Sequence, residues 1–389
     1  MKHTPDPIEV LVPEFFPVGF KTTAVAAGIK KSGLDLGLIV SDKPATAAAV
    51  FTKNTFPAAP VLLSRENLQA SGHKVRAVLV NAGNANACNG NEGMAAARSS
   101  AAQLASGLGC IPTEIFVSST GVIGRPLPVE KIFSALPGLL SASHDAAEFS
   151  RAIMTTDTFP KVACSESGGV RVFGFAKGSG MIHPNMATML SFILTDAKIE
   201  IPNLDRALRY AVDRSFHSIT VDGDTSTNDT VCILANGASG NTPEPGVFTA
   251  QLTDVCRQLA KSIARDGEGA SKFVELTVEG APSDEAAREI ARCVARSPLV
   301  KTAIYGSDPN WGRLVAAVGN SGVALVSNQI EIYIDNVSMI HGDLEAAQRR
   351  MKEKEIHLRI VLHSGIGRAT VWTCDFTEGY IRINADYTS

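Results

Sequence analysis

The stretch KGSGMIHPNMATMLSFIL, from Lys177 to Leu194, contains the sharpest change of character in the chain. It begins as a glycine-rich loop with a His-Pro-Asn turn, and after Ala187 it becomes the strand-like run Thr188-Met-Leu-Ser-Phe-Ile-Leu. Thr188 is therefore expected to open a buried strand directly after a loop that starts with a lysine. A hydroxyl at such a position can serve as a nucleophile, but a β-branched residue that simply opens a core strand explains the pattern as well.

Length and composition are those of an ordinary globular protein. The 389 residues suffice for two domains, and a net charge of −3 without a basic block gives no sign of a nucleic-acid or membrane-surface partner. No apolar run reaches the length of a membrane span, and the opening MKHTPDPIEV lacks the apolar core of a signal peptide. Seven scattered cysteines without a CxxC pair argue against disulfides and a zinc site. We therefore expect a cytoplasmic protein.

The hydrophobic pattern predicts both strands and helices, and we expect a mixed αβ protein of the α+β class. Strands are expected at 18–27, 36–40, 46–52, 75–80, 115–118, 161–164, 170–175, 188–195, 231–235, 273–279, 329–334, 356–362, 369–373 and 380–383. Helices are expected at 92–108, 128–140, 145–154, 247–265 and 344–352, and after N-caps at Asn203 and Ser283. The Ala-Pro-Ser turn at 281–283 is a plausible hinge between two domains.

Several polar turns offer chemistry. A sharp Thr120-Gly121 turn can aim a hydroxyl and a backbone N–H at one point, as an oxyanion hole requires. Thr155 begins a run of hydroxyls at a helix end, where such residues usually cap the helix. Glu268, between two glycines, can reach into a cleft or simply lie at a solvated helix end. The acidic loop 220–230 lacks the glycine and glutamate positions of an EF-hand, so we expect a structural or site-bordering loop.

These stretches together resemble one known family, the self-cleaving bifunctional ornithine acetyltransferase/N-acetylglutamate synthases, or ArgJ family. The resemblance covers nearly the whole chain, and members cut themselves between an Ala and a Thr, which here are Ala187 and Thr188. The matching strings, in order, are NANAC (84–88), STGVIG (119–124), MTTDT (154–158), KGSGMIHPNMATML (177–190), TVDGDTSTNDT (220–230), GSDPNWGR (306–313) and NADYTS (384–389). Trp311, in the sixth string, is expected to be a buried packing residue.

The resemblance implies a layered α-β-β-α sandwich as a catalytic domain, residues 1–280, and a smaller C-terminal α/β domain, residues 281–389, whose tail returns to the active site. Cleavage would give an α fragment, 1–187, and a β fragment, 188–389. By resemblance Thr188 is the nucleophile, Thr120 and Gly121 form the oxyanion hole, and substrate is contacted by Thr155, Lys177, Thr188, Glu268, Asn384 and Ser389. Many members end in Thr, so Ser389 is a departure.

The chemistry explains why cleavage would activate Thr188. A threonine hydroxyl needs an adjacent base, and a freed α-amine, with a pKa of roughly 7.7–8.0, can take its proton near neutral pH. The expected reaction is ping-pong: N2-acetylornithine acetylates Thr188, ornithine leaves, and glutamate accepts the acetyl group as N-acetylglutamate. Lys177 suits a substrate carboxylate, and Glu268 suits a substrate ammonium.

No GxGxxG, P-loop, HExxH or GxSxG motif is present, so we expect no cofactor and no metal. The family includes members that use acetyl-CoA as a donor and members that do not, and the sequence leaves this choice open. The expected partners are small amino-acid substrates and, by resemblance, a second copy of each fragment. The main alternative is a self-cleaving N-terminal-nucleophile aminopeptidase or amidase, which would pass the acyl group to water. A non-enzymatic binding module is the third reading.

Overall fold

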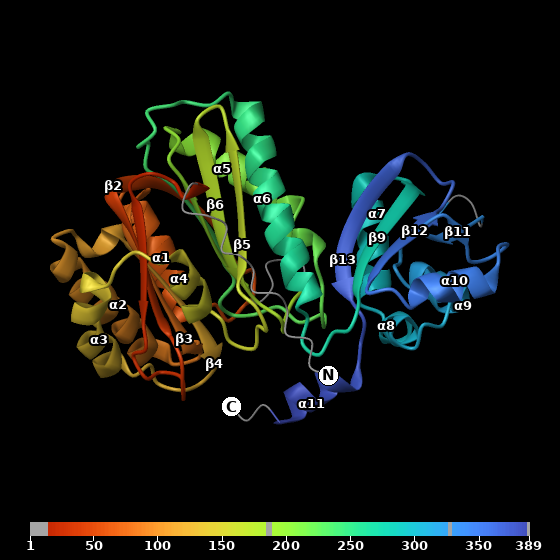
Figure 1. The fold of residues 1–389 in the computed structure, drawn as a ribbon, viewed down its shortest axis with the longest axis horizontal. Helices are drawn as coiled ribbons and strands as arrows, with labels where there is room; N and C mark the ends of the chain where they lie inside the picture. Colours follow the sequence, from red (N-terminus) through yellow and green to blue (C-terminus); the bar gives the residue numbers. More distant parts are fainter. Residues whose placement is uncertain (1–14, 184–188, 326–328, 387–389) are drawn as a thin grey trace.

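The structure, a computed structural model, describes residues 15–183, 189–325 and 329–386, which form two β-sheets with helices around them (Figure 1). The first sheet has eight strands in the order β4-β3-β2-β8-β7-β6-β5, with β1 paired to β2. Its strands are β1 (Phe20–Val25), β2 (Leu36–Phe51), β3 (Lys74–Asn84), β4 (Ile115–Val122), β5 (Lys161–Ser167), β6 (Val170–Lys177), β7 (Leu190–Thr195) and β8 (Thr230–Ala235). Its helices are α1 (Ala59–Ala70), α2 (Gly90–Leu108), α3 (Val129–Ser141), α4 (Ala146–Ala152), α5 (Ile201–Asp213) and α6 (Pro245–Arg265).

Strand β2 carries this sheet from one layer into the next. Residues 36–40 pair antiparallel with β3, and residues 46–51 pair antiparallel with β8. The register is irregular between Val40 and Ala45, and such bulges let a strand bend and change layer. The two strands expected at 36–40 and 46–52 are thus the two halves of one long strand.

The alternation of side chains along the strands builds four layers. On β6, Phe173 lies in a central core that β3 shares through Val78, while Val172 points into a second core that is closed by α5 and α6. On β3, Leu79 points the other way, into a third core under α2 and α3. Figure 1 shows α2 and α3 on one outer side and α6 on the other. The predicted α-β-β-α sandwich is confirmed.

The C-terminal part has a sheet and a core of its own, which confirms the predicted smaller α/β unit. Its first strand, Phe273–Ala281, pairs with two others, so the second sheet begins before residue 281, where the sequence analysis places the domain boundary. The sheet order is β11-β10-β12-β9-β13. Its elements are β9 (Phe273–Ala281), β10 (Glu331–Ile334), β11 (Val337–Ser338), β12 (Glu355–Val361), β13 (Gly367–Cys374), α7 (Asp284–Ala295), α8 (Pro298–Tyr305), α9 (Trp311–Gly319) and α10 (Leu344–Met351), and α11 (Glu378–Asp386) follows.

Three local predictions are wrong. Residues 380–383 belong to the helix α11, because this exposed segment has no neighbouring strand in the described sheets and a helix satisfies its own backbone. The residue preceding α5 is Glu200 rather than Asn203, since Pro202 favours the first helical turn. Trp311, expected to be buried, is 42% exposed at the start of α9. The predicted cap at Ser283 is confirmed, because its side chain accepts the N–H of Ala286.

The two parts meet where the segment that follows a short 3-10 turn, η3 (Phe216–Ser218), runs beside β13, with a parallel bridge between Ile219 and Trp372. Thr220 N donates to the carbonyl of Trp372 at 3.0 Å, and the Arg292 guanidinium donates to the carbonyl of His217 at 3.0 Å. Burial lowers the pKa of His217 to about 4; Asp213 opposes this shift, and Arg292 adds to it. The imidazole is therefore neutral in the folded protein at neutral pH.

We expect His217 to contribute to a loss of stability as the pH falls from about 6.5 towards 4. In that window the unfolded imidazole takes up a proton while the folded one does not, so protons favour unfolding. His217→Gln should remove up to about 3 kcal/mol of this pH-dependent loss. Melting temperatures measured across that pH range would show a smaller drop for the variant than for the wild type. An equal drop would contradict the prediction, and His341→Gln, at an exposed site, is the control.

Candidate active site

Lys177, at the end of β6, is the buried centre of the candidate site. Its ammonium donates to the hydroxyl of Thr155 at 2.7 Å and to that of Thr120 at 3.3 Å. Burial lowers the pKa of Lys177, and the carboxylate of Asp157, 4.0 Å away, opposes that shift. The Lys177 ammonium on β6 therefore joins two other predicted site residues, Thr120 on β4 and Thr155 after α4.

Gly121 allows β4 to lie unusually close to β3 beside Thr120. Its φ is 132°, and an added Cβ would lie 2.3 Å from the carbonyl carbon of Gly83, so only glycine fits. The structure thus fixes the backbone next to the Thr120 hydroxyl. That Thr120 and Gly121 form an oxyanion hole stays a prediction.

Asp157 ties this centre to the glycine loop, although the sequence analysis did not select it. Its Oδ1 accepts hydrogen bonds from Lys161 Nζ at 2.7 Å and from Gly178 N at 2.6 Å, and its Oδ2 accepts from Thr155 N at 3.0 Å. Burial works against its charge, but the ammonium groups of Lys161 and Lys177 hold the pKa of Asp157 well below its usual range. The sequence holds two signals for it, its place in the string MTTDT (154–158) and a lysine four residues later.

The same Lys161 connects the site to the end of α6. Its Nζ lies 2.5 Å from Oδ2 of Asp266, which also accepts the backbone N–H of Thr158 at 2.9 Å. All three charged side chains are nearly inaccessible to solvent. This buried pairing fixes the loop that carries Glu268.

Glu268 and the C-terminal helix meet at the edge of the site. Oε2 of Glu268 accepts a hydrogen bond from Asn384 Nδ2 on α11 at 2.9 Å, and the backbone N–H of Glu268 donates to the carbonyl of Ser179 at 2.9 Å. Thr377, just before α11, donates to the carbonyl of Gly269 at 2.6 Å. Glu268 and Asn384, which are predicted from distant parts of the sequence, are therefore in contact. Their role in binding substrate stays a prediction.

Ala187, Thr188 and Ser389 lie outside the described residues. The residue that follows position 188, Met189, donates its N–H to Oδ1 of Asp229 at 3.0 Å. On the other side of residues 184–188, Asp222 accepts the N–H groups of Met181 at 2.5 Å and Ile182 at 2.9 Å. Both aspartates belong to the acidic loop 220–230, which therefore borders the site.

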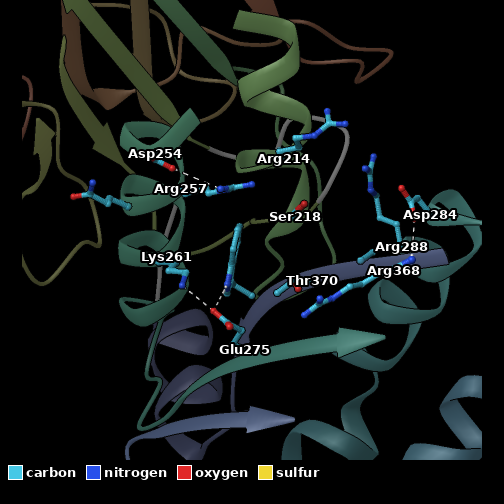
Figure 2. A pocket seen from close by; sticks show the side chains of 13 residues that line it. Arg214, Ser218, Asp254, Arg257, Lys261, Glu275, Asp284, Arg288, Arg368 and Thr370 are labelled. Atoms are coloured by element: carbon cyan, nitrogen blue, oxygen red, sulfur yellow. Dashed lines mark hydrogen bonds and ion pairs between the residues drawn. The ribbon is translucent and has the colours of Figure 1, made fainter. Parts of the chain in front are cut away.

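A cleft of about 670 Å³ lies between the two parts of the protein (Figure 2). It is lined by η3, α6 and Arg214, which follows α5, on one side and by α7, β9 and β13 on the other. In the described structure each of its five basic side chains has an acidic partner within 4 Å; the pairs are Arg214–Asp213, Arg257–Asp254, Lys261–Glu275, Arg288–Asp213 and Arg368–Glu279. Its basic side chains are already paired, and none of the predicted site residues lines it.

Comparison with known proteins decides the family. The model of the ArgJ family matches residues 21–389. The chain belongs to the ArgJ family. The arginine biosynthesis bifunctional protein ArgJ of Geobacter sulfurreducens is 49% identical over 389 residues, 95% of this chain and 98% of that protein. The protein of the same name from Thermus thermophilus is 47% identical over 379 residues, 96% of this chain and 99% of that protein.

A solved ArgJ structure, from Bacillus halodurans, is 42% identical and covers 51% of this chain and 100% of its own, with a TM-score of 0.49. The predicted family and enzyme class are confirmed by the family match and the full-length relatives: this ArgJ-family protein is an acetyltransferase of arginine biosynthesis. The roles of individual residues stay predictions.

Proposed function

We propose that this ArgJ-family protein cuts itself between Ala187 and Thr188 and then moves the acetyl group of N2-acetylornithine to glutamate through acetyl-Thr188. Ornithine and N-acetylglutamate are the products. The observation that supports this most is the buried ammonium of Lys177 between the hydroxyls of Thr120 and Thr155, at the end of the strand that pairs with β7. Position 188 lies two residues before β7.

The described residues suit the two parts of an amino-acid substrate. Lys177 has three N–H groups, and its hydrogen bonds to described side chains use two of them, which leaves a donor for a substrate carboxylate. Glu268, held by Asn384, offers a carboxylate for a substrate ammonium. Acyl transfer forms the bond between the Thr188 oxygen and the acetyl carbon and breaks the bond to the ornithine nitrogen. The proton from the hydroxyl passes through the α-amine to the departing nitrogen.

We propose that the enzyme works without a metal or organic cofactor, that acetyl-CoA is at most a second acetyl donor, and that two α and two β fragments assemble in the cytoplasm. Among the described residues, no group of three His, Cys, Asp or Glu side chains could hold a metal ion, and no described helix is long and apolar enough to span a membrane.

Two measurements test the proposal. Intact mass of the purified protein should show two fragments that end and begin at Ala187 and Thr188. Incubation with N2-acetylornithine should release ornithine in an amount limited to the number of sites, and glutamate should make the release continuous with one N-acetylglutamate per ornithine. Continuous release of acetate and ornithine without glutamate would favour the hydrolase instead. A parallel reaction with acetyl-CoA as the sole donor tests the second acetyl source.

Gly180→Ala is expected to weaken substrate binding while the fold persists. An added Cβ would lie 2.3 Å from Cδ of Glu268 and 2.4 Å from both carboxylate oxygens, so the flexible carboxylate must move. We expect kcat/KM to fall by about tenfold or more, mainly through KM, with a stability change below about 1 kcal/mol. Gly138→Ala, where an added Cβ meets nothing within 4 Å, is the control. An unchanged KM in the Gly180 variant would argue against a binding role for Glu268.

A further inference from the structure

Asn228 joins two neighbouring backbone segments through one buried amide. The side chain is 5% exposed and lies near the end of the acidic loop 220–230, just before β8. Its Nδ2 donates to the carbonyl of Ser119 on β4 at 2.9 Å and to the carbonyl of Ala85, after β3, at 2.7 Å. Its Oδ1 accepts the hydroxyl of Thr227 at 2.6 Å. Both N–H groups of the amide are therefore in use, and the two carbonyls decide which end of the amide is the nitrogen.

The loop that carries this amide is anchored to the segment between β2 and α1. The hydroxyl of Thr52 donates to the carbonyl of Ser226 at 2.7 Å, and the N–H of Ala58 donates to the carbonyl of Thr227 at 2.9 Å. The N–H of Asn228 itself donates to the hydroxyl of Ser226 at 3.1 Å. The amide is thus held in a fixed place from which it can position β4.

The two carbonyls lie on either side of an irregular point in the β3–β4 pairing. Asn84 lies opposite both Thr120 and Val122, which makes a bulge beside Gly121. Bulges change the direction of side chains and are common next to active sites. Since β4 stands at the end of the sheet order, it pairs within the described sheet with β3 alone. The amide of Asn228 supports this bulge from outside the β3–β4 ladder.

The hydrogen bond to Ser119 fixes the backbone that carries Thr120. Peptide bonds are planar and trans, so the Ser119 carbonyl and the Thr120 N–H lie in one plane and point in opposite directions. A fixed carbonyl therefore fixes that peptide, and with it the place from which the Thr120 side chain and Gly121 follow. The Thr120 hydroxyl lies in the candidate site, where it accepts a hydrogen bond from Lys177 at 3.3 Å. Asn228 thus acts on the predicted oxyanion hole from one residue away.

We propose that Asn228 is a positioning residue of the acyl transfer: it fixes the Ser119–Thr120 peptide and so orients the oxyanion hole that Thr120 and Gly121 are predicted to form. This role rests on the proposed function, because an oxyanion develops only when an acetyl carbonyl is attacked. Donors that are already oriented stabilise that charge without reorganising during the reaction, and a loosened donor loses part of this effect. Asn228 touches no reacting atom in this role and exchanges no proton.

Asn228→Asp tests this role, because the side chain keeps its shape and a carboxylate has no N–H group to donate. The Ser119 carbonyl then loses its partner and the peptide is released. We expect the variant to fold and to cut itself. Its kcat for transfer from N2-acetylornithine to glutamate should fall at least about tenfold, with both KM values within about threefold of the wild type. Intact mass follows the cut, and kcat is referred to the ornithine released in the first turnover without glutamate.

Asn67→Asp is the matched control. Asn67, on α1, is 7% exposed, and its Nδ2 also donates to two backbone carbonyls, those of Pro112 at 3.2 Å and Ile115 at 2.9 Å, where β4 begins. Both changes therefore remove a pair of buried donors from the same strand region. A purely structural role of Asn228 predicts equal kcat values for the two folded variants. The positioning role predicts that Asn67→Asp keeps kcat within about threefold of the wild type.

Coupling to Thr120 gives a second measurement. Thr120→Ala removes the hydroxyl of the predicted oxyanion hole and should lower kcat on the order of 100-fold in the otherwise wild-type protein. Combined with Asn228→Asp, the same change should cost at least about threefold less, because the hydroxyl is then no longer held in place. Combined with Asn67→Asp, the two effects should simply multiply.

Each other outcome overturns the inference. Asn228→Asp with a kcat near that of the wild type, a loss that Asn67→Asp shares, or no coupling to Thr120 would leave Asn228 a purely structural residue. A folded but uncut variant would place Asn228 in the cleavage step instead. If Asn228→Asp does not fold, Asn228→Ser takes its place with the same expected results, and failure of both to fold would again indicate a structural role. A wild type that neither cuts itself nor transfers acetyl groups would refute the proposed function itself.

Discussion

Thr188→Ala is expected to yield one uncut polypeptide of 389 residues without measurable acetyl transfer. One oxygen atom serves both steps: the hydroxyl attacks the Ala187 carbonyl to give an ester that water hydrolyses, and afterwards it carries the acetyl group. Removing the nucleophile of a covalent catalyst typically lowers kcat on the order of 10⁶-fold. Intact mass and ornithine release on the same preparation measure both effects.

Thr188→Ser is the matched control, since it keeps the hydroxyl and loses only a methyl group. We expect it to cut itself and to retain transfer within about tenfold of the wild type. Two fragments from Thr188→Ala would show that another group cleaves the chain, and transfer by the uncut alanine variant would remove position 188 from the mechanism.

The layers of this protein are readable from its sequence because each inner strand has two different faces. Phe173 and Val172, adjacent in the chain, enter different cores, and so do Val78 and Leu79. Runs that are apolar on both faces predict buried strands, and these are placed correctly. The run Tyr380–Ile383 has the same local character but belongs to α11, because strand formation depends on a neighbour that a local pattern does not reveal.

The residues of the candidate site also fall into two groups, those that the sequence predicts and those that it does not. Thr120, Thr155 and Lys177 were found through matching strings, and the structure brings their side chains together. The sequence does not single out Asp157, Asp229 and Asp266, because an aspartate in a polar loop has the sequence signature of a solvated turn. These aspartates are distinguished by burial, which arises only when distant elements pack over the loop. Burial strengthens the electrostatic interactions of their carboxylates.

Lys161→Met is expected to lower the free energy of unfolding by about 3–5 kcal/mol. Lys161 lies 2.7 Å from Asp157 and 2.5 Å from Asp266, and all three side chains are shielded from water. Methionine fills a similar volume but leaves both carboxylates without this partner, and Lys177, at 4.0 Å, is then the one described cation that still pairs with Asp157. Because the pairing also anchors the loop of Glu268, acetyl transfer should fall as well. Urea denaturation and steady-state kinetics measure the two effects.

The matched comparison is Arg98→Met, which breaks an ion pair of 2.6 Å whose side chains are 56% and 52% exposed. Water already screens that pair, so we expect a loss below about 1 kcal/mol.

The loss of stability caused by Lys161→Met should also become smaller as the pH falls. Burial raises the pKa of Asp266, and the ammonium of Lys161 opposes that shift. Without the lysine, the pKa of Asp266 should rise further. A carboxyl whose folded pKa lies above its unfolded value stabilises the fold on protonation and loses that contribution as the pH rises. A deficit equal to that of Arg98→Met, or one that does not change with pH, would show that Lys161 contributes little beyond packing.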